Sequence, residues 1–153
     1  DFFSDRHRIA LFYNRSDKEI QGDFLAMVQS SPLAEAVSGS VYRASADSSY
    51  RPRDSKVEDI EVILTKGFTE QVQEGVITIL VYVPDTDPYN NGVLVEDGAR
   101  TAQLARIAQD WINSCPERGT GYSIEQRDTI EAIAYPDIKQ HAVSVQLHYK
   151  FYE

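Results

Sequence analysis

The sequence has only one cysteine, Cys115, and it lacks both long apolar runs and recognisable catalytic motifs. A single cysteine cannot close an internal disulfide, and it cannot hold zinc by itself. The longest apolar run, residues 76–83, is too short to cross a bilayer, and no stretch resembles a signal sequence. Glycine-rich phosphate loops and nucleophile motifs are missing as well. These absences predict a soluble, unexported protein of a reducing compartment that is not an enzyme and needs no cofactor or metal.

Basic residues are also scarce, because 15 Lys and Arg stand against 24 Asp and Glu, which gives a formal net charge of -9. Tight binding to nucleic acid needs clustered Lys and Arg to neutralise phosphates, so this balance argues against it. An acidic surface still suits a protein that lies beside DNA without binding it tightly. The 153 residues, 42% of them hydrophobic, are enough for one domain with a sizeable core.

The last stretch, residues 142–152, has the clearest pattern in the chain. Apolar side chains alternate with polar ones, which is typical of a strand with one buried face. The apolar set is Val143, Val145, Leu147, Tyr149 and Phe151. At roughly 3.3 Å per residue the strand is about 36 Å long. We expect it to be the spine on which shorter elements pair.

Three helices are predicted. Ser16 and Glu19 have the capping-box spacing, and Ser31-Pro32 starts a short second helix that we expect Gly39 to end in the left-handed conformation. Asp97 can cap a main helix over residues 98–114. Its apolar stripe consists of Leu104, Ile107, Ala108, Trp111, Ile112 and Cys115, so we interpret Cys115 as a core residue.

Further strands are predicted where β-branched and aromatic residues cluster. A short strand over 41–43 precedes a hairpin, and the hairpin pairs 59–65 with 76–83 around an extended tip. Two more short segments are residues 122–126 and 130–135. The chain is therefore predicted to be α+β, with a mostly antiparallel sheet, one long helix packed across it and a short N-terminal helical pair. We predict that residues 1–15 form an arm or edge strand and that 16–153 form a single domain.

Two long polar loops separate these elements, residues 44–57 and 84–96. We expect the first to be mobile in the free protein. It contains most of a basic cluster that nearby acidic residues match, and such a mixed-charge loop is more often a protein contact or a solvated tip than a nucleic-acid site. The basic residues are Arg43, Arg51, Arg53 and Lys56.

Neither histidines nor acidic residues predict a metal site. His141 and His148 lie an odd seven positions apart, which places them on opposite faces of one strand about 23 Å apart. The spacing of Asp85, Asp87 and Glu96 superficially resembles a calcium loop. The match fails at the fifth and sixth positions, where tyrosine and asparagine replace an oxygen ligand and the required glycine. We interpret this segment as a solvated acidic loop.

Three stretches, residues 31–42, Arg51-Pro52 and 58–62, stand out together with the order of the predicted elements. In these features the chain resembles the small neck and tail-completion proteins of tailed bacteriophages, and tail terminators in particular. The resemblance implies a ring, usually a hexamer, that caps or joins the tail tube and meets the head connector in the virion. It implies no catalytic residues, and it implies that DNA passes through the lumen without tight binding. The N-terminal arm and the 84–96 loop depart from the usual pattern.

Contacts between subunits or with neighbouring proteins are expected in the two polar loops, where isolated aromatic residues could become ordered on assembly. The candidate interface residues are Arg43, Tyr50, Arg51, Arg53, Asp85, Asp87 and Tyr89. One alternative is a monomeric α+β regulatory module that binds a ligand or protein between a helix and a loop. An enzyme of unrecognised type is a third possibility, although the sequence lacks the paired titratable groups of such a site.

Overall fold

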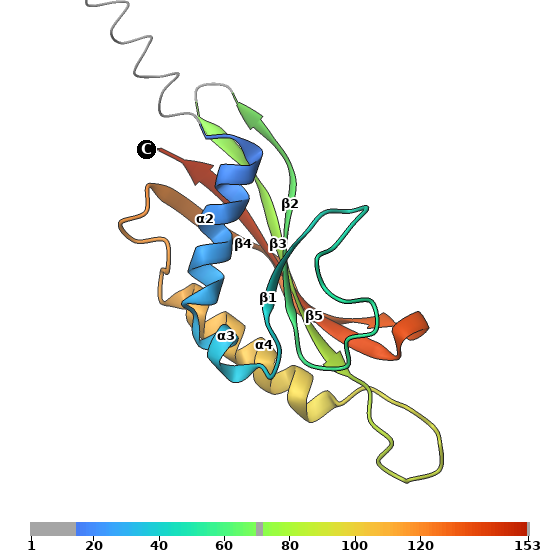
Figure 1. Cartoon of the computed structure of the whole chain (residues 1–153). Helices are drawn as coiled ribbons and strands as arrows, with labels where there is room; N and C mark the ends of the chain where they lie inside the picture. Colours follow the sequence, from blue (N-terminus) through green and yellow to red (C-terminus); the bar gives the residue numbers. More distant parts are fainter. Residues whose placement is uncertain (1–14, 70–71, 153) are drawn as a thin grey trace, which may run out of the picture.

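Five strands form one sheet in the computed structural model, which describes residues 15–69 and 72–152 (Figure 1). The strands are β1 (Val41–Ala44), β2 (Ile60–Thr69), β3 (Gln73–Pro84), β4 (Tyr122–Tyr135) and β5 (Gln140–Phe151). They are ordered β1-β2-β3-β5-β4. Among the described strands, β1 and β2 pair in parallel, and the other neighbouring pairs are antiparallel. The predicted mostly antiparallel sheet is confirmed.

The helices α2 (Asp17–Gln29), α3 (Pro32–Ala36) and α4 (Gly98–Asn113) lie on one side of this sheet (Figure 1). A short 3-10 turn, η1 (Pro136–Ile138), connects β4 to β5. α4 contacts β3, β4 and β5, while α2 contacts β1 and β2. The predicted α+β class, with its long helix and N-terminal helical pair, is therefore confirmed. The predicted N-terminal arm lies outside the described residues except for Arg15.

Local hydrogen bonds explain where the helices begin. The Ser16 hydroxyl accepts from the Glu19 backbone N–H, and the Glu19 carboxylate accepts from the Ser16 backbone N–H, which completes the predicted capping box. The Asp97 carboxylate accepts from the Arg100 backbone N–H at 3.2 Å at the start of α4. Both caps satisfy backbone donors that a helix leaves unpaired.

Gly39 does not end α3 in the left-handed conformation, so that prediction is wrong. Val37 ends the helix in an extended conformation, and Gly39 is not among the residues with positive φ. Glycine is needed here for a different reason, because a Cβ atom would overlap the Asp59 carboxylate. The Gly39 backbone N–H donates to the Glu58 carbonyl at 2.8 Å. Gly39 therefore allows the end of the helical pair to approach the start of β2.

β5 is an interior strand, paired with β3 on one side and with β4 on the other. Its odd-numbered residues from Val143 to Tyr149 are buried against the helices, as the alternation predicted, and Phe151 is partly buried. Ala142 and Ser144 on the opposite face are buried as well. A second, small apolar cluster of Leu80, Tyr82 and Ala142 lies there. The sheet is therefore covered on part of its second face, which the sequence pattern did not predict.

The hairpin between β2 and β3 has a shorter connection than expected, since β2 continues to Thr69 and β3 begins at Gln73. Gly67 and Gly75, predicted to be in a loop tip, are strand residues facing the Tyr149 hydroxyl. A Cβ atom on either glycine would lie within 2.8 Å of that oxygen. Glycine makes room for a buried tyrosine here, and does not form a turn.

β4 is one continuous strand, although the sequence predicted two short segments. Its pairing with β5 shifts between Arg127 and Glu131, and Asp128 has a φ of 61°. A bulge at this point explains why the apolar pattern is interrupted without ending the strand.

The C-terminal end of α4 also differs from the prediction. Cys115 follows the helix with a φ of 56° and is exposed, so its assignment to the core was wrong. The left-handed backbone turns the side chain away from the apolar stripe.

Within the described residues, no helix is long and apolar enough to cross a membrane.

Candidate functional site

The candidate interface residues lie in two separate regions of the molecule. Tyr50, Arg51 and Arg53 belong to loop 45–59, which joins β1 to β2, and Arg43 lies on β1 just before it. Asp85, Asp87 and Tyr89 belong to loop 85–97, which joins β3 to α4. Figure 1 shows loop 45–59 beside the sheet, whereas loop 85–97 extends away beyond the end of β3.

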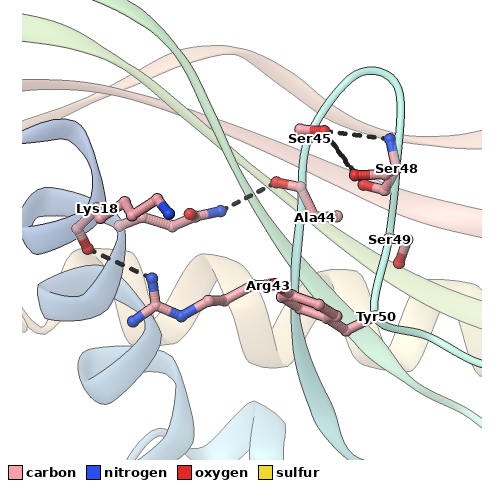
Figure 2. A pocket seen from close by; sticks show the side chains of 8 residues that line it. Lys18, Arg43, Ala44, Ser45, Ser48, Ser49 and Tyr50 are labelled. Carbon is pink, nitrogen blue, oxygen red and sulfur yellow. Dashed lines mark hydrogen bonds between the residues drawn. The ribbon is translucent and has the colours of Figure 1, made fainter.

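A groove of about 410 Å³ lies between α2 and the turn that follows β1 (Figure 2). We call it the Lys18 groove. It is lined by Lys18 and Gln21 from α2, Arg43 and Ala44 from β1, and Ser45, Ser48, Ser49 and Tyr50 from the turn. The groove therefore contains two of the candidate residues, Arg43 and Tyr50, together with α2 residues that sequence reasoning missed.

Hydrogen bonds hold the two walls of the Lys18 groove together. The Gln21 side-chain amide donates to the Ala44 carbonyl at 2.9 Å and to the Val62 carbonyl at 2.8 Å. Arg43 reaches back toward α2, where its guanidinium donates to the Lys18 carbonyl at 3.4 Å (Figure 2). The turn itself is closed by a bond from the Tyr50 backbone N–H to the Arg43 carbonyl at 3.1 Å. The shape of the groove is thus set by the fold.

The chemistry of the Lys18 groove is cationic and hydroxyl-rich. Lys18 and Arg43 are its charged lining residues, and the part of the chain that the structure describes places no acidic residue in its lining. On a chain with a net charge of -9, this is a local exception. Such a site favours an anionic or aromatic group, because a cation attracts the negative face of an aromatic ring and serine hydroxyls can bond polar atoms.

Arg51 does not face outward as an interface residue would. It is 9% exposed, and its Nε donates to the Asp59 carboxylate at 2.8 Å. Its Nη2 donates to Gln140 Oε1 at 2.9 Å and to the backbone carbonyls of Ser55 and Val57. The guanidinium also lies 4.0 Å from the centroid of the Tyr82 ring. Arg51 therefore anchors loop 45–59 to the second face of the sheet.

Asp59 completes this buried network. Burial alone raises the pKa of its carboxyl, but hydrogen bonds from Ser55, the Ser40 backbone and Arg51 outweigh burial and lower that pKa overall. The distances from the two donors other than Arg51 are 2.5 Å for the Ser55 hydroxyl and 2.9 Å for the Ser40 N–H. A fully hydrogen-bonded carboxylate beside a guanidinium is a structural ion pair.

A second buried carboxylate, Glu61, lies on the same face of the sheet. It accepts from the Tyr82 hydroxyl at 2.7 Å and from the Ser49 hydroxyl. Burial, followed by this bond to Glu61, raises the pKa of Tyr82 well above its usual value. The pair ties loop 45–59 to β2 and β3, so these titratable groups serve the fold.

Loop 85–97 is built in a different way, because its hydrogen bonds are mostly its own. The Asp87 carboxylate accepts from the backbone N–H groups of Asn91 at 3.0 Å and Gly92 at 2.8 Å. Thr86 and Val95 form an isolated bridge with two backbone bonds of 2.8 Å. Tyr89 at the turn is 84% exposed. The loop thus has a defined shape and presents an aromatic side chain to solvent.

The acidic residues of loop 85–97 do not converge on one point. Asp85 pairs with His141 at 2.7 Å, Asp87 closes its own turn, and Glu96 accepts from the Thr101 hydroxyl at 3.0 Å. The described residues contain no group of three side chains placed to hold a metal ion. His148 lies 3.9 Å from Glu74, on the strand face opposite to that of His141.

Arg53 is exposed on the outer side of loop 45–59. It lies near η1, in a shallow depression that also includes Lys56, Asp137 and Lys139. This region is separate from the Lys18 groove, so the structure does not bring all the candidate residues into one site.

No protein-family model matches the chain, and no curated protein matches it. The fold and the two surfaces described above, the Lys18 groove and loop 85–97, are therefore the basis for a functional proposal.

Proposed function

We propose that the protein is a structural component of a tailed-bacteriophage virion that forms a ring at the neck or at the end of the tail tube. Its partners are copies of itself, as a hexamer, together with tail-tube and head-connector proteins. The protein is made in the bacterial cytoplasm and joins the virion on assembly. This proposal extends the resemblance in element order to a specific kind of assembly.

The proposal rests mainly on the exposed position and defined shape of loop 85–97. It extends from the body of the molecule (Figure 1). It presents apolar side chains to solvent, since Tyr89 is 84% exposed and Val93 is 57% exposed. Its internal hydrogen bonds give it a fixed shape, so little conformational entropy is lost when it binds. A projecting aromatic on a shaped loop is suited to anchoring a protein contact.

The charge of the chain supports the same proposal. With a net charge of -9 on each copy, a ring carries a strongly negative field that disfavours adhesion of DNA phosphates. DNA then passes through the ring with little adhesion, which a conduit requires.

Mass measurement by light scattering, followed by negative-stain imaging, tests the proposal. We expect a species several times the 17.3 kDa monomer, and rings in the images. If the protein alone is monomeric, rings are expected on mixing with tail-tube protein. A monomer under both conditions would contradict the proposal.

The Lys18 groove favours a second candidate, a monomeric binding module for an anionic ligand or protein segment. Its volume of about 410 Å³ is within the range of small-molecule sites. The same scattering measurement separates the two candidates, because the second one predicts a monomer at every concentration.

A further inference from the structure

We propose that loop 85–97 of one copy docks into the Lys18 groove of the next copy, with the Tyr89 ring as its anchor. This inference rests on the proposed ring and identifies the two surfaces that build it. It assigns a specific occupant to the groove, namely a segment of a second copy of this chain.

Charge complementarity is the first argument. Residues 85–97 include Asp85, Asp87, Glu96 and Asp97 and contain no lysine, arginine or histidine. The groove has the opposite character, since Lys18 and Arg43 line it without an acidic neighbour among its lining residues. A negative loop and a positive groove on an otherwise acidic chain attract each other, and the same charges oppose contact between two loops.

The chemistry of Tyr89 is the second argument. Its ring is almost fully exposed in the single copy, which leaves a large apolar surface in water. In the groove, the ring can lie against the Lys18 or Arg43 cation, an arrangement that stabilises both groups. The Ser45 and Ser48 hydroxyls lie 3.2 Å from each other, and their oxygens can also accept a hydrogen bond from the phenol hydroxyl.

The placement of the two surfaces is the third argument. Loop 85–97 extends from the end of β3, whereas the start of α2 lies toward the opposite end of the molecule (Figure 1). The groove is lined by Lys18 and Gln21 from this part of α2. The two patches are different and lie apart, so their contact joins copies head to tail. A head-to-tail contact generates a closed ring when its rotation closes, which is the symmetry that the proposed function requires.

Arg43 is held ready for this contact by its packing. A Cβ atom at Gly22 would lie 3.0 Å from the Arg43 guanidinium, so the absence of a side chain in the middle of α2 leaves room for it. A residue that costs helix stability is thus placed where the groove needs space.

Cysteine cross-linking between two different variants tests the docking directly. In a Cys115→Ser background, Ser48→Cys marks the groove and Val93→Cys marks the loop, and neither change removes a charged residue or Tyr89. Mild oxidation of the mixed variants is expected to give a disulfide-linked dimer on a non-reducing gel. The matched control replaces Val93→Cys by Arg106→Cys, an exposed position on α4, and is expected to give none.

Two sets of substitutions measure the strength of the contact. Tyr89→Ala is expected to raise the dissociation constant of the assembly at least about tenfold, as the loss of an aromatic anchor typically does. Lys18→Glu combined with Arg43→Glu is expected to do the same. The control Arg106→Glu with Arg118→Glu makes the same change in net charge outside the groove and is expected to leave assembly intact.

The outcomes distinguish this inference from the proposed function. Rings that form normally with Tyr89→Ala, and that give no Ser48–Val93 cross-link, would overturn the docking and leave the ring proposal standing. Titration of inorganic phosphate into assembled rings adds a further outcome, because saturable binding in the groove would show that it is vacant and not filled by a neighbour. The absence of any assembly would overturn both proposals.

Discussion

Loops 45–59 and 85–97 look alike in sequence but are held in opposite ways. Both are long and polar, and both contain an isolated tyrosine. Loop 45–59 is held against the sheet, because Arg51 is buried and contacts Asp59, Gln140 and Tyr82. Loop 85–97 satisfies its own backbone through Asp87 and turns Tyr89 outward. The comparison teaches that the hydrogen-bond partners of a loop, and not its polarity, decide whether it serves the fold or a neighbour.

This difference predicts that substitutions in loop 45–59 mainly change the free energy of unfolding, whereas substitutions in loop 85–97 mainly change assembly. The two effects are separable, because Arg51 and Asp59 are buried and Tyr89 is not. The following experiments test the separation, beginning with the largest expected effect.

Arg51→Ala is expected to lower the free energy of unfolding by about 3–5 kcal/mol, because it leaves the buried Asp59 carboxylate without its cation. Urea unfolding of the protein, diluted until it is monomeric, measures the change, because assembly would add to the apparent stability. Arg53→Ala in the same loop and Tyr89→Ala in the other loop are exposed controls and are each expected to stay within about 0.5 kcal/mol. If Arg51→Ala and Arg53→Ala lower the free energy of unfolding equally, Arg51 does not anchor loop 45–59 to the sheet.

Acid is expected to weaken the same anchor. The pKa of folded Asp59 is lowered, so its contribution to stability is present above the ordinary aspartate value of 3.8 and is lost as the pH falls through the folded value. Urea midpoints measured between pH 7 and pH 2 are expected to fall in the lower part of this range. Asp59→Asn is expected to make the urea midpoint fall less steeply with decreasing pH. If the midpoint falls as steeply as in the unsubstituted protein, other carboxyl groups determine acid stability.

Tyr82→Phe is expected to cost about 1–2 kcal/mol, since it removes a buried hydrogen bond and leaves Glu61 with only the Ser49 hydroxyl. Thermal unfolding is a suitable measurement. Tyr152→Phe, which removes an exposed hydroxyl, is the matched control and is expected to have no measurable effect. If Tyr82→Phe leaves the thermal stability unchanged, water replaces the donor that Glu61 has lost.

Apart from the exposed controls, the smallest effect on stability is expected for Asp87→Ala. The Asp87 bonds are exposed, so the free energy of unfolding is expected to change by less than about 1 kcal/mol. Amide exchange at Asn91 and Gly92 is nevertheless expected to accelerate, because both N–H groups lose their acceptor. Asp87→Asn keeps one side-chain oxygen and is expected to retain part of the protection. A large loss of stability would indicate that loop 85–97 supports the core.

The sequence predicted the features that depend on neighbouring residues. The capping box at Ser16 and the cap at Asp97 were recognisable because donor and acceptor lie within three positions of each other. The alternation in β5 was recognisable because one face packs against the helices along most of its length. These elements were enough to predict the α+β class.

Features that depend on distant residues were not predictable in this way. Arg51 meets Gln140, which is 89 positions away, so nothing near Arg51 indicated that it would be buried. Gly67 and Gly75 looked like loop residues, and only the fold brings the Tyr149 hydroxyl to them. Cys115 continued the apolar stripe of α4 in sequence, but the backbone turned at that residue. The Lys18 groove likewise arises only when α2 meets β1.

The position of β5 between β3 and β4 also sets the order in which the chain can fold. A nascent chain emerging from the ribosome can form the β2–β3 hairpin early, yet β4 pairs with β5, which is complete only when residues 140–151 have been synthesised. Until then, the side of β3 that pairs with β5 lacks that partner. Completion of the sheet is therefore a late event that joins segments far apart in sequence. A translation product that stops before β5 would expose unpaired strand edges, which proteases and chaperones can recognise.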